Sequence, residues 1–286
     1  MRATSIALHS STSEEPITFS LRDADPTAQY MIRTIAGLDA EEITPRYYAT
    51  GMNTKPKFYS FKLRPREIVM RIVLKPRFNL DESYGDVRDE LYRLISASRT
   101  GTITLQIYSG TTLVGQLEGH INRFESVVFT QLPEVQITIL CPDPMIKAIN
   151  PVIMEPQELT NFNPVIIPDS LSTAPHGFHM HIQFTSPSIM FMIQDREADP
   201  EWEFRVVPAG GFLAGDVLHL STDFAENHLF IDRSGTIIHL VDKVQPGSLW
   251  PIIFPGSNEF WISEVSDGIF LFDWIDLEYY PAYWGV

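Results

Sequence analysis

The 286-residue sequence contains one cysteine, Cys141, and no run of about 18 consecutive apolar residues. A single thiol excludes an intramolecular disulfide and a zinc site built from several thiolates. Without a long apolar run, we expect no membrane-spanning helix. The first residues, MRATSIALHSSTSEEP, combine a short apolar segment with early acidic residues. We therefore expect no secretory signal there.

Signatures of common catalytic sites are also missing. The sequence has no GxxxxGK(S/T) phosphate loop, no GxGxxG, no HExxH, no GxSxG elbow and no CxxC. We therefore predict a protein that is not an enzyme. No residue is assigned a catalytic, cofactor-binding or metal-binding role.

Basic residues are scarce in the second half of the chain. Residues 1–150 hold 17 Lys and Arg against 17 Asp and Glu, whereas residues 151–286 hold 4 against 19, which accounts for the whole net charge of -15. This contrast predicts two domains, and the proline-rich segment CPDPMIKAINPVIMEP separates them. We place the domains at residues 1–148 and 149–286. Because the second half is strongly acidic, direct binding of nucleic acid or acidic membranes by it is disfavoured.

The first half combines strand patterns with one helical pattern. Apolar and mixed residues alternate from Arg66 to Leu74, which predicts a half-buried strand. The segment ESYGDVRDELYRLISAS predicts a helix in which Asp86 caps the first turn. Its apolar stripe consists of Val87, Leu91, Leu94 and Ile95. Strand-like runs follow to residue 141, so we expect an α+β domain. It would consist of a β-sandwich, one helix and a β-arm.

The β-arm is predicted between residues 39 and 65, where prolines, Gly51 and aromatic residues occur without a sustained period. Such a segment is a long loop or an extended arm. Its aromatic residues are Tyr47, Tyr48, Phe58, Tyr59 and Phe61. They would supply contact area for a neighbouring subunit or pack within their own subunit, and both interpretations stay open.

The second half shows about eight short strand patterns separated by turns, with no helical stripe. This predicts a β-sandwich or jelly roll, and the whole chain is expected to be mainly β.

One run of histidines, HGFHMH, has spacing that a metal site could use. His179 and His181 fall on the same side of a strand, and His176 is near enough to act as a third ligand. No carboxylate within this run completes the set. We therefore favour imidazoles on a strand face over a metal site.

The acidic run DREADPEWE and the tryptophans suggest two further possibilities. Acids at alternate positions resemble a calcium loop, but Pro200 stands where the bend needs glycine, so a solvated turn is favoured. The acids are Asp195, Glu197, Asp199, Glu201 and Glu203. Glu201 and Glu203 could serve glycoside hydrolysis, although nothing fixes their separation. Tryptophans such as Trp202 and Trp261 could stack on sugars, or they could build the sandwich core, which we favour.

The chain contains, in this order, the segments YMIRTIAGLDAEEITPRYYATG, LRPREIVMRIVLKP, DVRDELYRLI, GTITLQIYSGTTLVGQLEGHINRFE and EVQITILCPDPMIKA. Together they resemble the N-terminal domain of siphophage distal tail proteins. In that family an early strand ends in Gly-Leu, an Arg-containing strand precedes the helix, and the last strand closes in a Cys-Pro-Asp-Pro-like turn. The closing EFWISEV and IDLEYYPAYWGV also look like the end of this family, with its Trp-Gly.

The resemblance implies a structural protein of the virion, located at the phage tail tip and made in the bacterial host cytoplasm. Six copies of the first domain would form a homo-hexameric ring between the tail-tube protein and the tail-associated baseplate-hub protein. The second domain, galectin-like or carbohydrate-module-like, would carry a receptor-binding protein or touch host saccharide. DNA would pass through the ring without specific binding. Either acids such as Asp39 and Glu118 face the lumen, or the lumen charge is modest.

Overall fold

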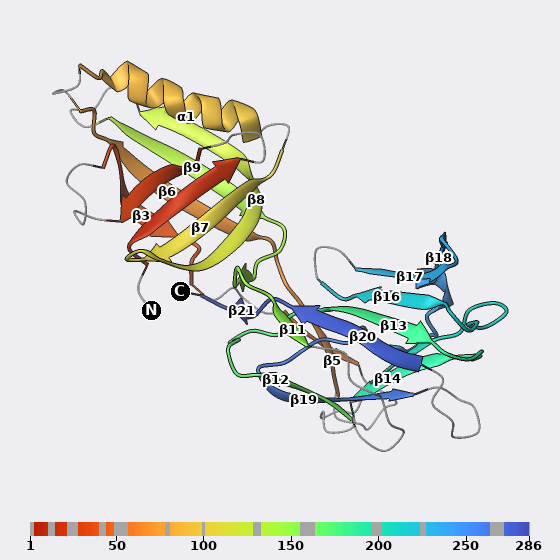
Figure 1. The fold of residues 1–286 in the computed structure, drawn as a ribbon. Coiled ribbons are helices and arrows are strands. Elements are labelled where there is room, and N and C mark those ends of the chain that lie inside the picture. Colours follow the sequence, from red (N-terminus) through yellow and green to blue (C-terminus); the bar gives the residue numbers. More distant parts are fainter. Residues whose placement is uncertain are drawn as a thin grey trace. The chain divides into compact units, whose positions relative to one another are not determined.

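The computed structural model describes twelve stretches of the chain (Figure 1). They are residues 3–10, 15–21, 28–39, 44–48, 57–77, 81–98, 101–127, 133–154, 164–195, 202–223, 227–263 and 272–285. The chain divides into two compact units. Unit 1 comprises Met1–Tyr48, Tyr59–Ile149 and Tyr283–Val286, and unit 2 comprises Ala49–Phe58 and Asn150–Ala282.

Unit 1 is built on one large sheet. Its strands are β1 (Ser5–Ser10), β2 (Ile17–Leu21), β3 (Tyr30–Ala36), β6 (Arg66–Leu74), β7 (Ile103–Ser109), β8 (Thr112–Val127), β9 (Glu134–Cys141), β10 (Ile146–Lys147) and β21 (Ala282–Tyr283). Their order in the sheet is β21-β10-β8-β7-β1-β2-β3-β6-β9. The strand near the end of the chain therefore belongs to the same sheet as the first strands.

This sheet closes into a barrel because β8 changes partner along its length. The first part of β8 pairs with β7 up to Gly119, and the second part pairs with β9 from His120 onward. A Cβ atom at Gly119 would lie 2.7 Å from the backbone oxygen of Leu140, so only glycine fits at this change of partner. We expected a β-sandwich here. The difference arises because the 16-residue strand β8 is long enough to pair with β7 at one end and with β9 at the other.

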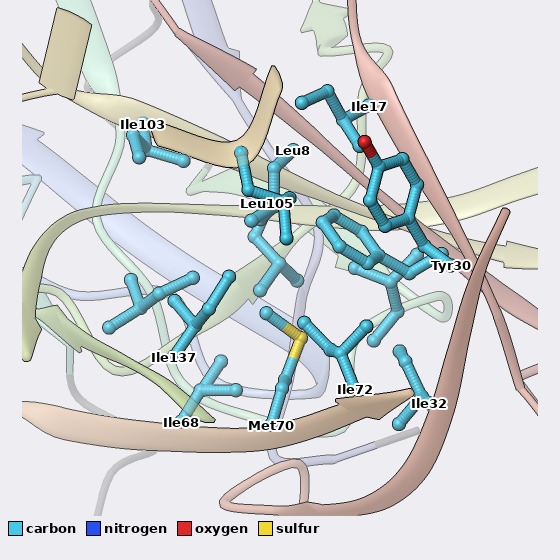
Figure 2. Close-up of a cluster of buried hydrophobic side chains, with 14 of the residues drawn as sticks. Leu8, Ile17, Tyr30, Ile32, Ile68, Met70, Ile72, Ile103, Leu105 and Ile137 are labelled. Atoms are coloured by element: carbon cyan, nitrogen blue, oxygen red, sulfur yellow. The ribbon is translucent and has the colours of Figure 1, made fainter. Parts of the chain in front are cut away.

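The interior of the barrel is filled by the alternating side chains that the sequence indicated. Ile68, Met70 and Ile72 of β6 are all fully buried. They meet residues from several other strands in one cluster (Figure 2). Its labelled members also include Leu8, Ile17, Tyr30, Ile32, Ile103, Leu105 and Ile137. The apolar residues at alternate positions of β6 therefore form part of the inner face of the barrel.

Helix α1 (Tyr84–Ser98) contacts β1, β6 and β8 of the barrel. Val87, Leu91 and Ile95 are buried as predicted, while the side chain of Leu94 lies outside the described residues. The residue before the helix, Ser83, caps it. The Ser83 Oγ accepts the Asp86 amide at 3.2 Å, and the Asp86 Oδ2 accepts the Ser83 amide at 2.9 Å. Asp86 is thus the second member of a capping box rather than the cap itself.

Unit 2 consists of two facing sheets. Their strands are β11 (Val152–Met154), β12 (Val165–Asp169), β13 (His179–Phe184), β14 (Phe191–Asp195), β15 (Trp202–Val206), β16 (Val217–Ser221), β17 (His228–Arg233), β18 (Thr236–His239), β19 (Gly256–Ser263) and β20 (Phe272–Tyr279), with the 3₁₀ helix η2 at Val241–Lys243. One sheet has the order β11-β20-β13-β16-β17-β18 and the other β12-β19-β14-β15.

The two sheets of unit 2 share one hydrophobic core. Met180 and Leu218 enter it from the six-stranded sheet, and Phe191 and Phe260 enter it from the four-stranded sheet. This arrangement is a β-sandwich. Together with the barrel, it confirms the prediction of a mainly β chain.

The segment predicted as a loop or β-arm contains β4 (Thr44–Tyr48) and β5 (Lys57–Lys62), which pair as a separate two-stranded sheet. The side chains of Tyr47, Tyr48 and the other arm aromatics lie outside the described residues. In the part of the chain that is described, no helix is long and apolar enough to cross a membrane.

Candidate functional site

Unit 1 contains a fully buried arginine, Arg66, at the start of β6. Its Nε donates to the carbonyl oxygen of Pro144 at 2.6 Å, and Nη2 donates to that of Trp284 at 2.7 Å. Nη1 donates to the carbonyl oxygens of Gly37 and Asp39, both at 2.9 Å. A buried guanidinium tolerates desolvation only when its fixed donors are matched in this way.

The four acceptors come from three separate parts of the chain. Gly37 and Asp39 follow β3, Pro144 follows β9, and Trp284 follows β21. Arg66 therefore joins the three motifs that carry the resemblance, Gly-Leu, Cys-Pro-Asp-Pro and Trp-Gly. We call this set of contacts the Arg66 junction. It fixes the points at which the chain leaves unit 1 after β9 and returns to it at β21.

Gly37 fits the junction for two reasons. Its φ of +92° is in the region that side chains rarely adopt, and an added Cβ atom would lie 2.1 Å from the backbone oxygen of Glu67. The junction presents carbonyl oxygens already bonded to Arg66 and supplies no nucleophile. The junction therefore holds separate segments of the chain together.

The three histidines of HGFHMH are separated in unit 2. His176 is buried, with Nε2 at 3.0 Å from the Asp169 Oδ2 and Nδ1 at 2.9 Å from the Gly177 carbonyl oxygen. Its ring stacks on Tyr279 at a centroid distance of 5.1 Å. Burial, with the Asp169 carboxylate, raises the pKa of Tyr279. His176 is therefore buried in the interior of unit 2 and lies apart from the other two histidines.

His179 and His181 point to the outer face of the six-stranded sheet, as the strand pattern predicted. The neighbouring strands place His219, His228 and His239 on the same face. Sequence reasoning missed these three, because each stands alone in its own strand pattern. The available signal was their alternation with core residues, such as Leu218 and Leu220 around His219.

The acidic run does not form a recognisable site among the described residues. Asp195 is buried, and Glu203 pairs with Arg205 at 2.8 Å. Glu197, Asp199 and Glu201 lie outside the described residues, so the proposed Glu201–Glu203 pair is not defined. Within the twelve stretches, no three His, Cys, Asp or Glu side chains converge on a point that could hold a metal ion.

The tryptophans proposed for sugar stacking are partly used by the core. Trp202 packs against the core and meets Phe260 edge to face at 5.6 Å. Trp250 packs against the same core and contacts Phe204 at 5.2 Å. These two rings support the interpretation of the tryptophans as structural.

Comparisons with known proteins give a match in structure alone. No family model matches the sequence, and no curated protein matches it either. The crystal structure of the phage SPP1 Dit protein superposes with a TM-score of 0.59 at 11% identity. The alignment covers 97% of this chain and 98% of the SPP1 chain.

The chain has the fold of the SPP1 Dit protein. The resemblance to distal tail proteins that the sequence predicted is thereby confirmed at the level of the fold. SPP1 Dit is described as a paradigm of the hub adsorption apparatus in phages that infect Gram-positive bacteria. Two structures of the phage P2 baseplate in its activated conformation, with Ca and with Sr, align at 8% identity with TM-scores of 0.41 and 0.40. They cover 97% and 95% of this chain and 98% and 97% of theirs.

Proposed function

We propose that this protein is a structural virion protein, the distal tail protein of a phage tail tip. In this proposal residues 1–148 form a homo-hexameric ring, and residues 149–286 form a module that carries host-adhesion components. The ring joins the tail-tube protein to the tail-associated baseplate-hub protein, and DNA passes through it without specific binding. The protein would act in the virion without catalysis.

One observation carries the proposal: the match to SPP1 Dit runs through both units, over 97% of this chain and 98% of the other. A β-sandwich or a small barrel alone serves many unrelated functions. A shared succession of both units along almost the full length of two chains is a more specific similarity. It therefore supports a common role better than either unit would alone.

The Arg66 junction is consistent with a role in assembly. It holds the outgoing and returning segments of the chain against the barrel through bonds of 2.6–2.9 Å. A ring subunit that carries a second module needs such fixed attachment points, because forces on the module are transmitted through these segments. The junction achieves this with backbone acceptors.

The charge distribution also agrees with this arrangement. Unit 2 contains nearly all of residues 151–286, which carry the whole net charge of -15, whereas residues 1–150 are neutral overall. Neutral ring-forming parts approach one another without strong repulsion. Acidic modules repel one another and favour separate positions around a ring.

The mass of the purified protein in solution tests the proposal. One chain has a mass of 32.5 kDa, so light scattering coupled to size exclusion should give about 195 kDa for six copies, and negative-stain images should show six-fold rings. Immunogold labelling of virions with antibody to this chain provides the second arm. Gold at the far end of the tail is the expected result, and gold at any other part of the virion would overturn the proposal.

A further inference from the structure

The outer face of the six-stranded sheet in unit 2 carries five of the eight histidines of the chain: His179, His181, His219, His228 and His239. The register of the strands arranges five side chains in one row across the sheet. The row runs Asp276, His181, His219, Phe230 and His239, one residue from each of β20, β13, β16, β17 and β18. Side chains directly opposite each other on neighbouring strands are close enough to act together.

Aromatic packing on this face is centred on Phe230. Phe230 stacks with His219 at a centroid distance of 4.5 Å and with His228 at 5.5 Å, with interplanar angles of 12° and 29°. Two imidazoles are therefore stacked on Phe230, which leaves less of the Phe230 ring face for a sugar to stack on. Imidazole edges carry nitrogen atoms, so this surface is better suited to coordination than to carbohydrate stacking.

The rings of His181 and His219 lie close enough together to act as a metal-binding pair. Their ring centroids are 4.5 Å apart, and the rings are steeply inclined at 64°. With metal–nitrogen bonds of about 2.0–2.1 Å, two imidazoles in neighbouring coordination positions have centroids roughly 4.5–5.2 Å apart. The observed centroid separation lies in this range, and because the rings meet edge to face, side-chain rotation has to bring one nitrogen of each ring to the ion.

Asp276 orients the first of these rings. The Nδ1 of His181 lies 2.7 Å from the Asp276 Oδ1, on β20. Because β13 lies between β20 and β16, Asp276 and His219 flank His181 on opposite neighbouring strands. A carboxylate that accepts the Nδ1 proton leaves the Nε2 lone pair free and makes it more basic, as in carboxylate–histidine–metal arrangements. The side chains of His181 and Asp276 remain accessible to solvent, with 38% and 41% of their surface exposed.

We propose that His181 and His219 bind a divalent transition-metal ion on the outer face of unit 2, with Asp276 positioning His181. Zn²⁺, Ni²⁺ and Cu²⁺ are the expected class, since they prefer imidazole, whereas Ca²⁺ and Mg²⁺ prefer oxygen ligands. Because no third His, Cys, Asp or Glu among the described residues converges on the pair, water completes the coordination. The ion would thus keep open positions toward solvent.

Titration calorimetry with Ni²⁺ and Zn²⁺ tests the proposal on the full chain, purified without a polyhistidine tag, at pH 7.5. We expect saturable binding of one ion per chain. His181→Gln and His219→Gln should each weaken it at least tenfold, and Asp276→Asn should weaken it less, because the amide still orients the ring but makes Nε2 less basic. Ca²⁺ should give no competing binding.

His239→Gln is the matched control, since His239 lies in the same row but Phe230 separates it from the pair. This variant should bind as the wild type does. Electron paramagnetic resonance of the Cu²⁺ complex should show two nitrogen ligands in the wild type and one in His219→Gln. Circular dichroism without metal checks that each variant is folded. Equal affinity in all variants would overturn the proposal, and so would loss of binding in His228→Gln but not in His219→Gln.

Discussion

Arg66 donates a hydrogen bond of 2.7 Å to the carbonyl oxygen of Trp284, which lies 218 positions later in the sequence. The same guanidinium reaches Pro144, 78 positions away, and Gly37, 29 positions away. One side chain thus holds together segments that are far apart along the chain. These bonds are formed only in the folded state, so they act directly on the stability of unit 1.

Replacing Arg66 with methionine should lower the free energy of unfolding by about 3 kcal/mol or more, because four carbonyl groups lose the donor that the buried guanidinium supplies. Urea denaturation followed by circular dichroism measures the loss. Arg71→Met is the matched control, since Arg71 is an exposed residue of the same strand that bonds to the Gln136 side chain at 3.3 Å. It should cost less than about 1 kcal/mol. Equal losses in the two variants would contradict the role assigned to the junction.

Gly37→Ala should destabilise unit 1 more than Gly110→Ala. Both glycines have positive φ, at +92° and +64°, so both substitutions carry backbone strain of about 1 kcal/mol. Only at Gly37 would the new methyl group meet a backbone atom, the Glu67 oxygen at 2.1 Å, while the space at Gly110 is open. Thermal unfolding should show the larger fall in Tm for Gly37→Ala. Equal Tm values for the two variants would show that the contact with the Glu67 oxygen does not add to the destabilisation.

The strands and the helix were predictable because their signals are local. Alternation in β6 and the stripe of α1 each lie within about 15 neighbouring residues, and the structure buries Ile68, Met70, Val87 and Leu91 accordingly. The closed barrel was not predictable in the same way. Its closure depends on where β8 changes partner, and a pattern of alternating residues does not reveal which strand a given segment faces.

The candidate sites depend on register and on backbone acceptors, which single-sequence patterns do not report. Arg66 resembles any other arginine near a proline, because the four groups that it joins at the junction are backbone carbonyl oxygens. His181 and His219 become a pair only once β13 and β16 are aligned. The run HGFHMH drew attention to His176, which the fold instead buries against Asp169. Closeness in sequence was a poor guide to closeness in space.

Ser83→Ala should loosen the first turn of α1 and cost about 1 kcal/mol, since the Asp86 amide loses its side-chain acceptor. Hydrogen exchange of the amides of residues 84–87 measures this effect directly. Ser96→Ala, at an exposed position of the same helix, is the control and should be neutral or slightly stabilising, because alanine is the better helix former. Faster exchange in both variants alike would mean that the cap contributes nothing specific.

Tyr47 and Tyr48 of β4 test whether the arm serves assembly. If it docks on a neighbouring subunit, replacing both tyrosines with serine should shift the mass in solution from about 195 kDa toward 32.5 kDa without unfolding the chain. Light scattering gives the mass, and circular dichroism shows whether the fold is kept. A protein that unfolds would place the two rings in the core of a subunit instead.

Acid should destabilise unit 2 through Asp216. The Arg233 Nε and Nη2 donate to its two carboxylate oxygens at 2.9 and 2.7 Å, and the Leu213 amide donates to it at 2.8 Å. Burial alone would raise the pKa of Asp216, but these hydrogen bonds together hold it below its ordinary value of 3.8. Since the folded pKa is the lower one, the stabilisation is complete above pH 3.8 and is lost as the pH falls through the folded pKa.

Asp216→Asn should therefore cost about 2 kcal/mol at pH 7 and much less near pH 2. The difference in unfolding free energy between wild type and variant, measured by urea denaturation from pH 7 to pH 2, should shrink across the acid range. Asp242→Asn is the control, because Asp242 is exposed and pairs with its neighbour Lys243. Its effect should be small and should disappear in high salt, whereas the Asp216 effect should persist because that carboxylate is buried. A difference for Asp216→Asn that stays constant with pH would show that the carboxylate charge is not what stabilises this turn.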